Sequence, residues 1–309
     1  MKKILCVLMS CLLFVMAGCS GHSKNLKFGA ADIGGVYYSF ASTFTQLADK
    51  EIDGYTFETK TTAGSVANLR LISDGYIDLA IVQADLLSDA YNATGTFADK
   101  KYQKGYKAVA SLYTECCQIV VRKDSGITGI DDLINKTVSV GASESGTEKN
   151  AEQILKMSGI TDELINKVNM DYTEAAEKLK AGEIDAFFCT AGTRTEVIGQ
   201  LSKECDIRLI SLDDKCIDKM LSAYSLCEKY TIPAGTYNGQ DSDVTTIGVK
   251  AVLIAKQSLS DDVIKNVTKT IYEHADDFKY ATSLDISFDI NTAADGVDIP
   301  FHSGAAAYY

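Results

Sequence analysis

Two stretches of this sequence occur twice, in the same order, and this repeat is the strongest constraint on the fold. Residues 29–35 (GAADIGG) and 141–147 (GASESGT) share the pattern G-A-x-x-x-G. Residues 73–84 (SDGYIDLAIVQA) and 180–191 (KAGEIDAFFCTA) share a glycine, an Ile-Asp pair and an apolar run. Two matches in the same order indicate that the chain is built from two similar halves.

Each half alternates apolar segments with amphipathic ones. Short apolar runs such as 26–30 and 168–172 are expected as strands, and amphipathic stretches such as 65–75, 147–159 and 260–278 are expected as helices. Gly75 and Gly182 occupy the positions at which glycine commonly ends a helix. Strands that alternate with helices of this length are typical of an α/β fold with largely parallel sheets.

Two similar α/β halves predict two domains with a cleft between them. We expect residues 26–113 plus 247–309 to form the first domain and 114–246 the second, with the segments 114–123 and 245–255 crossing between them. Ligand sites in α/β sheets lie beyond the carboxyl ends of the strands. The sequence therefore predicts a small ligand held between the domains, which close around it by a hinge motion.

Helix N-termini are expected beside this cleft in both halves. The first amides of a helix are unpaired and carry a partial positive charge, so they favour anions. Each opening has capping its own helix as an alternative role, but three openings in corresponding places favour a ligand. The predicted residues are Gly34, Gly35 and Val36; Gly64 and Ser65, with Asn68 one turn further along; and Ser145, Gly146 and Thr147.

The predicted anion is a carboxylate and not a nucleotide. The loops contain neither G-x-G-x-x-G nor the lysine of a P-loop, and they have few basic side chains. Arg194 is the exception, and arginine binds carboxylates through two parallel hydrogen bonds. We expect Arg194, or the backbone of Thr190, Ala191 and Gly192, to contact one carboxyl group; a solvated Arg194 is the alternative.

Two further polar positions are candidates for ligand contact. Tyr37 and Tyr38 follow the double glycine, so one hydroxyl can face the ligand while the other ring packs, and the sequence leaves open which does which. Gln83 ends a buried strand. A buried amide needs hydrogen-bond partners, which either a ligand or a neighbouring loop can supply.

The N-terminal residues are typical of an exported bacterial lipoprotein. Lys2 and Lys3 precede a 14-residue apolar run, residues 4–17, which is shorter than the roughly 20 residues that span a bilayer. We therefore interpret residues 1–18 as a signal peptide. The segment VMAGC places small residues before Cys19, as in the lipobox, in which the cysteine is lipidated.

Lipidation of Cys19 would anchor the chain to the outer face of the cell membrane, which is the periplasmic side in a Gram-negative cell. Residues 19–25 then form a linker to the first domain. The alternative is an ordinary signal peptide, cut after Ala17 or Gly18, which leaves no lipid anchor.

Composition excludes several classes of function. Removal of residues 1–18 leaves 291 of 309 residues, enough for two domains, and changes the formal charge from −12 to −14. So acidic a chain repels nucleic acid, and we predict no nucleic-acid partner. The three histidines are scattered, so no metal site and no cofactor are predicted. We expect a monomer whose six remaining cysteines are mostly free and buried.

An enzyme is the main alternative in kind. Asp32 and Asp85 could form a carboxylate pair, but neither stands out from acids that cap helices. Ser39, Ser65 and Ser145 have no histidine in the corresponding loops, so no nucleophile is paired with a base. We therefore predict a binding protein and not an enzyme.

Several long motifs resemble those of the TAXI family, the extracytoplasmic solute receptors associated with TRAP importers. They include GGVYY (34–38), TTAGSVANLRLI (61–72), VSVGASESGTEKNA (138–151) and IPFHSGAAAYY (299–309), and the similarity runs from Leu26 to Tyr309. The resemblance implies a two-domain periplasmic-binding-protein-like (type II) fold with a ligand cleft between the domains.

The same resemblance implies capture of a small carboxylate, such as glutamate or a related dicarboxylate, by inter-domain closure. The receptor would then deliver this solute to TRAP membrane subunits, which use an ion gradient. Two departures from the family pattern are Arg194, where proline is frequent, and the Cys116-Cys117 pair. The alternative is a solute receptor of an ABC importer, or a sensor protein.

Overall fold

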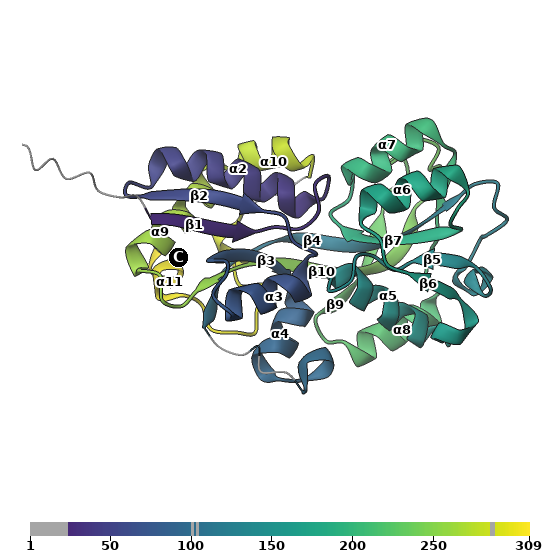
Figure 1. The fold of residues 1–309 in the computed structure, drawn as a ribbon, viewed down its shortest axis with the longest axis horizontal. Helices are drawn as coiled ribbons and strands as arrows, with labels where there is room; N and C mark the ends of the chain where they lie inside the picture. The colour runs from purple at the N-terminus through teal and green to yellow at the C-terminus, as the bar shows by residue number, and fades with distance from the viewer. Residues whose placement is uncertain (1–23, 100–101, 103–104, 285–287) are drawn as a thin grey trace, which may run out of the picture.

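A computed structural model describes residues 24–309, apart from 100–101, 103–104 and 285–287 (Figure 1). The predicted signal peptide and the predicted lipidation site, Cys19, lie outside the described residues. Among the residues described, no helix has both the length and the apolar character needed to cross a membrane.

One mixed sheet runs through both halves of the molecule (Figure 1). Its strand order is β2 (Tyr55–Lys60), β1 (Lys24–Gly29), β3 (Leu79–Gln83), β10 (Val244–Lys256), β4 (Tyr106–Arg122), β7 (Ala186–Ala191), β5 (Thr137–Ser139) and β6 (Asn166–Val168). Two further strands pair at the centre: β8 (Ile207–Leu209) with β4, and β9 (Cys227–Ile232) with β10.

Strands β4 and β10 connect the two halves and pair antiparallel with each other. β10 also pairs with β3 of the first half and with β9, whereas the later part of β4 pairs with β7 and β8 of the second half. The crossovers expected at 114–123 and 245–255 fall in these strands. The domain boundaries at 113/114 and 246/247 also fall within them and remain predictions.

Helices cover both faces of the sheet in each half (Figure 1). In the first half these are α2 (Val36–Glu51), α3 (Ser65–Ser73), α4 (Ala84–Asn92), α9 (Asp261–Glu273), α10 (Ala275–Thr282) and α11 (Ser303–Tyr308). In the second half they are α5 (Gly146–Met157), α6 (Tyr172–Ala181), α7 (Glu196–Glu204) and α8 (Asp214–Ala223). Short 3-10 turns lie at Gly95–Phe97, Ile130–Leu133, Asp162–Leu164 and Ile290–Thr292.

The apolar side chains of these helices form the core. Phe28 of β1 and Phe44 of α2 are fully buried, with ring centroids 5.5 Å apart in an edge-to-face arrangement. Phe40 of α2 stacks on Phe278 of α10 at 4.3 Å, so the C-terminal helices complete the core of the first half. In the second half, Phe188 of β7 belongs to a separate buried cluster between β7, α5 and α8.

The sequence repeat corresponds to a repeated local structure. In the first half, Asp78 and Lys27 exchange two hydrogen bonds: the Lys27 amide donates to Asp78 Oδ2 (2.9 Å), and the Asp78 amide donates to the Lys27 carbonyl (2.8 Å). In the second half, Asp185 makes the same pair of bonds with Thr137, both at 2.8 Å. Each Ile-Asp pair therefore aligns a central strand with its parallel neighbour.

The structure differs from the sequence prediction at three elements. The sheet is mixed and not largely parallel, because β4 and β10 run antiparallel to their neighbours. The segment 168–172, expected as a strand, instead ends β6 and begins α6, since Asp171 caps that helix by accepting from the Glu174 amide (2.8 Å). The helix expected over 260–278 is two helices, divided at His274.

The six cysteines of the described residues are all free thiols, as expected. Cys116 and Cys117 lie side by side in β4 but contribute to different hydrophobic clusters, so they point to opposite faces of the sheet. Burial raises the pKa of the Cys117 thiol to about 12, which keeps it protonated and unreactive.

Asn68 joins the carboxyl ends of two strands to helix α3. Its side chain is fully buried, and its Nδ2 donates to the carbonyls of Ala30 (2.7 Å) and Ile81 (2.9 Å). Its Oδ1 accepts from the Thr62 hydroxyl (2.7 Å). These bonds fix the loops that follow β1 and β3.

We predict that Asn68→Ala lowers the free energy of unfolding by about 3 kcal/mol, because it removes the buried hydrogen bonds that Asn68 makes with the Ala30 and Ile81 carbonyls and with the Thr62 hydroxyl. Urea denaturation monitored by circular dichroism measures this change. The matched control is Asn92→Ala at the exposed end of α4, which should change stability by less than about 0.5 kcal/mol. Equal effects of the two substitutions would contradict the structural role of Asn68.

Candidate functional site

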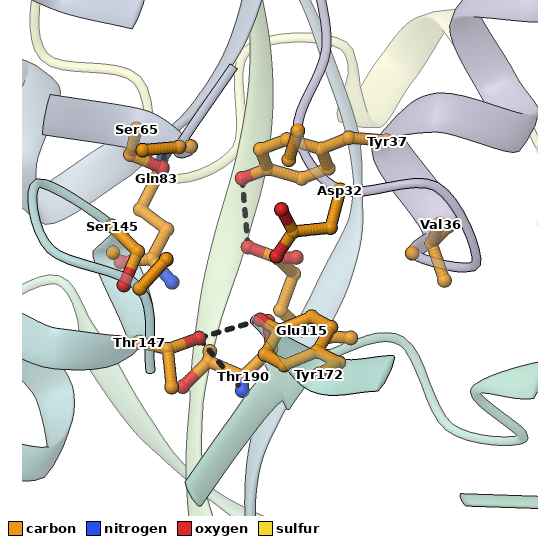
Figure 2. Close-up of a pocket in the computed structure, with 17 residues that line it drawn as sticks. Asp32, Val36, Tyr37, Ser65, Gln83, Glu115, Ser145, Thr147, Tyr172 and Thr190 are labelled. Carbon is orange, nitrogen blue, oxygen red and sulfur yellow. Dashed lines mark hydrogen bonds between the residues drawn. The ribbon is translucent and has the colours of Figure 1, made fainter. Parts of the chain in front are cut away.

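A buried pocket lies where the loops of the two halves meet, beside the centre of β4 (Figure 2). Most of the predicted ligand contacts line it. These are Gly35, Val36, Tyr37, Gly64, Ser65, Gln83, Ser145, Gly146, Thr147, Thr190 and Ala191. The structure therefore brings together the loops of both halves, as the cleft prediction requires.

Four predicted residues do not line this pocket: Gly34, Asn68, Gly192 and Arg194. Asn68 bonds the backbone behind it, and a Cβ on Gly192 would lie 2.6 Å from the Leu284 side chain. Gly34 and Arg194 instead line an outer cavity of about 320 Å³ between α2, α7 and α10. The outer cavity shares Gly35 and Val36 with the inner pocket, so the two adjoin.

Three helices begin at the pocket wall: α2 at Val36, α3 at Ser65 and α5 at Gly146. The N-caps of α2 and α3 are glycines without a capping side chain, whereas Ser145 caps α5 by accepting from the Glu148 amide (2.9 Å). Among the side chains described, capping therefore satisfies only one of the amides at these three helix starts, the Glu148 amide of α5. Within the described part of the chain, no acceptor is assigned to the amides of Val36, Tyr37, Ser65, Val66, Gly146 and Thr147.

Two acidic side chains, which the ligand prediction did not include, also line the pocket. Glu115 is 2% exposed, and its Oε2 accepts a hydrogen bond from the Tyr37 hydroxyl (2.8 Å). Asp32 points into the pocket from the loop after β1 (Figure 2). Of the described residues that line the pocket, none is lysine, arginine or histidine.

Burial changes the ionisation of both acids. It raises the pKa of Glu115 to about 8, although hydrogen bonds from Tyr37 and Gln83 oppose the shift. It also raises the pKa of Asp32 to about 6; the Asp171 charge adds to this shift and a backbone hydrogen bond from Tyr172 opposes it. No positively charged side chain among the described residues lines the pocket to offset these shifts and hold either carboxyl in its ionised form.

Glu115 has a recognisable sequence signal. It is the single acid in the otherwise apolar stretch SLYTECCQIVV, and a charged residue inside a buried strand is uncommon. Asp32 entered the sequence interpretation only as part of an enzymatic pair with Asp85, and Asp85 does not line the pocket. Tyr172, Ala31, Ala63 and Ala142 complete the wall without a distinct sequence signal.

Gln83 spans the two halves at the pocket floor. Its Nε2 donates to Asn150 Oδ1 of α5 (3.0 Å), while its Oε1 is buried and has no hydrogen-bond partner among the described residues. A Cβ on Gly146 would lie 2.4 Å from this Oε1, so only glycine permits this packing. A buried acceptor without a donor favours a ligand that supplies one.

Tyr172 fixes the wall on the side of the second half. Its hydroxyl bonds the Thr147 hydroxyl and the Thr190 carbonyl, the latter at 2.9 Å (Figure 2). The Thr190 amide donates to Thr147 Oγ1 (3.1 Å). The start of α5, the start of α6 and the end of β7 therefore form one hydrogen-bonded unit.

The two halves are in contact along the α3 side of the cleft. The Arg70 guanidinium makes two hydrogen bonds with the Glu144 carboxylate (2.7 and 3.2 Å), and the Ala67 amide donates to the Glu144 carbonyl (3.0 Å). The free space inside the inner pocket is about 30 Å³, enough for about two or three water molecules. The cleft is therefore closed.

The chain belongs to the NMT1-like family, which it matches over residues 28–309. Several solved structures share its fold. One is PhnD1 from Prochlorococcus marinus in complex with methylphosphonate (13% identity, 81% of this chain and 84% of that one, TM-score 0.56). Another is a putative L-cystine ABC transporter from Listeria monocytogenes (13% identity, 84% and 94%, TM-score 0.53).

A third is the ligand-binding component of an ABC-type import system from Staphylococcus aureus (14% identity, 88% of each chain, TM-score 0.51). These similarities confirm the predicted two-domain periplasmic-binding-protein-like fold. In the residues that the structure describes, no cluster of histidine, cysteine and acidic side chains is arranged to hold a metal ion.

Glu115 gives the stability of the protein a specific pH dependence. Above pH 4.5 the unfolded chain loses the Glu115 proton, while the folded protein keeps it until about pH 8. The free energy of unfolding therefore falls as pH rises through this range. Between pH 6 and 8 we predict a loss of up to about 2.5 kcal/mol from Glu115, and Asp32, with a pKa of about 6, completes its own titration in the lower half of this range.

Glu115→Gln cannot ionise, so its free energy of unfolding should fall less than that of the wild type between pH 6 and 8. Urea denaturation at both pH values measures the difference. Equal pH dependence of the two proteins would show that burial does not perturb Glu115.

Proposed function

We propose that this protein is an extracytoplasmic solute-binding protein that captures a small carboxylate between its two halves and delivers it to a membrane importer. The carrying observation is the convergence of α2, α3 and α5 on one buried pocket, with unpaired amides at each start. These amides come from both halves, so an anion bound among them favours the closed state.

Binding without turnover fits this pocket better than catalysis. Tyr172 and the Tyr37 hydroxyl are committed to hydrogen bonds, and no lining residue is a histidine or cysteine. An enzyme acting on a small organic acid is the second candidate, since Asp32 and Glu115 are acids with raised pKa values. Recovery of the bound acid unchanged after long incubation supports the receptor, and its conversion supports the enzyme.

The partner is the membrane part of an importer, and two classes are candidates. The Listeria structure of the same fold is named a putative ABC transporter and the Staphylococcus structure a component of an ABC-type import system, which favours an ABC importer. The TRAP class rests on the TAXI resemblance of the sequence motifs. In either case, we propose that a lipid on Cys19 holds the protein at the outer face of the membrane as a monomer.

Arg194 supports a dicarboxylate as the solute. It lines the outer cavity that adjoins the inner pocket, and it has no ion-pair partner among the described residues. Its backbone is left-handed (φ 66°), which is strained for a non-glycine residue and is frequent at functional sites. One carboxylate would bind the helix amides, and the second, as in glutamate, would extend towards Arg194.

We predict that a small carboxylate at one hundred times its Kd raises the free energy of unfolding by about 2.7 kcal/mol. A thermal-shift panel of mono- and dicarboxylates, amino acids and neutral solutes checks this. Stabilisation by neutral solutes alone would contradict the carboxylate assignment.

Gly146→Ala should weaken binding of that carboxylate by about tenfold or more, because the new methyl group collides with Gln83 at the start of α5. Isothermal titration measures the Kd. Gly129→Ala is the matched control, since a Cβ at Gly129 meets no atom within 4 Å and the residue lies outside the pocket. Equal Kd values for both variants would place the ligand elsewhere.

Arg194→Ala should weaken dicarboxylates by about tenfold and leave monocarboxylates unchanged, because only the second carboxylate reaches the outer cavity. Lys203→Ala on α7 removes another positive charge from the same outer cavity, and it tests whether any nearby positive charge, and not Arg194 in particular, strengthens dicarboxylate binding. An unchanged dicarboxylate Kd in Arg194→Ala would exclude Arg194 from the site.

The importer class is tested by uptake of the stabilising solute into membrane vesicles that contain the cognate permease. Uptake through an ABC importer requires ATP and continues without ion gradients, whereas uptake through a TRAP importer stops when the sodium and proton gradients are collapsed.

Binding of the protein to vesicles tests the anchor: Cys19→Ala should release the protein into the soluble fraction.

A further inference from the structure

We propose that the solute carries a protonated amine beside its carboxylate, and that Glu115, Asp32 and Gln83 Oε1 hold the amine opposite the helix amides. This inference rests on the proposed function and narrows it to amino acids or similar zwitterions. It gives a role to the hydrogen-bond acceptors of the pocket, which a carboxylate group alone does not use.

The pocket separates donors from acceptors. Its donors are the unpaired backbone amides at the starts of α2, α3 and α5. Its acceptors are the carboxyl groups of Asp32 and Glu115, which point into the same space from the loop after β1 and the middle of β4 (Figure 2). Gln83, at the end of β3, adds a buried Oε1 to the pocket wall. A ligand with one negative and one positive group satisfies both sets.

The buried acceptors specifically require a donor. Gln83 Oε1 is buried without a partner and has no proton to give, so a carboxylate alone leaves it unsatisfied. Glu115 has no basic residue among the described residues lining the pocket. An ammonium group offers three N–H donors and one positive charge, which together compensate these acceptors.

The small inner pocket fits the charged head of such a solute. Its free space of about 30 Å³ holds roughly two or three water molecules, so it has room for small charged groups and not for a whole side chain. The remainder of the solute extends past Gly35 and Val36 into the outer cavity of about 320 Å³. Fixed groups of the inner pocket thus bind the charged end of the solute, while the rest of the solute lies in the larger outer cavity.

A competing arrangement keeps Glu115 protonated, so that it donates to the solute carboxylate. The two arrangements predict opposite pH dependence between pH 6 and 8. Ammonium binding requires ionised Glu115, so affinity rises with pH, whereas a donating Glu115 gives affinity that falls. The titratable groups facing Glu115 are Asp32 of the loop after β1, Tyr37 of α2, Asp85 of α4, Tyr113 of β4, Tyr172 of α6 and Cys189 of β7.

Asp32 and Asp85 titrate near this range, since burial raises the pKa of each to about 6, and both are mostly ionised by pH 7. Tyr37, Tyr113, Tyr172 and Cys189 all have pKa values raised well above their usual range, so they stay protonated. A rise in affinity between pH 7 and 8 therefore reports Glu115.

The deciding experiment compares matched compounds by isothermal titration with the mature, unmodified chain. One set is alanine, lactate, propionate and ethylamine, and the other is glutamate, 2-hydroxyglutarate, glutarate and 4-aminobutyrate. We expect the amino acid of at least one set to bind tenfold or more tightly than its hydroxy and unsubstituted acids. Equal or tighter binding of an acid without an amine would overturn the inference and leave the proposed function intact. Binding of no acid at all would overturn both.

Glu115→Gln tests the assignment of the acceptor. It keeps the size of the side chain and an oxygen for the Tyr37 hydroxyl, but it removes the charge. We expect the amino acid Kd to rise tenfold or more and the hydroxy acid Kd to stay within twofold, so that amine selectivity is lost. Glu273→Gln on the exposed face of α9 is the matched control and should retain the wild-type selectivity. Retained selectivity in Glu115→Gln would contradict the role of Glu115, and the wild-type comparison decides the inference even where the variant is unstable.

Discussion

The antiparallel pairing of β4 with β10 is the interaction on which both halves and the site depend. They are the two central strands of the sheet: β10 also pairs with β3 of the first half and β4 with β7 of the second, so the β4–β10 ladder joins the two halves. The ladder contains register shifts next to Val252 and Ile254, and such irregularities increase the local bend and twist of a strand. Glu115 lies on β4 within this ladder, so the connection between the halves also carries a central group of the pocket.

The site combines groups that neither half holds alone. The first half supplies the starts of α2 and α3, Asp32 and Gln83, whereas the second supplies the start of α5 and the hydrogen-bonded unit around Tyr172. Only closure brings these groups around one space. Under the proposed function, solute binding and closure are two aspects of one equilibrium, and each amide or carboxyl that a solute satisfies would favour the closed form.

The sequence was informative wherever a local pattern has one physical cause. The repeated Ile-Asp pairs and the glycines before helices identified the α/β halves and most of the pocket wall, since strand ends and helix starts are encoded by neighbouring residues. Glu115, Tyr172 and β9 were missed for a different reason. Each acquires its role from partners far along the chain, such as Tyr37, which lies 78 residues from Glu115.

Arg194 and Asn68 illustrate the same division. Asn68 lies one turn into a predicted helix and Arg194 follows a predicted strand, and sequence spacing cannot show whether such a side chain turns inward or outward. In the structure, Asn68 turns towards the backbone of β1 and β3, and Arg194 lines the outer cavity. The six free cysteines agree with the sequence interpretation, because a chain of this size has enough core to be stable without disulfides.

The Arg70–Glu144 ion pair makes the closed state sensitive to ionic strength. It joins the halves at the α3 side, and its two side chains are one-third to two-fifths exposed, so dissolved salt screens it. Under the proposed function, sodium chloride would act in two ways: it would weaken the contact between the halves and compete with an anionic solute for the helix amides. Affinities measured in dilute buffer would overstate how tightly the protein holds its solute in saline surroundings.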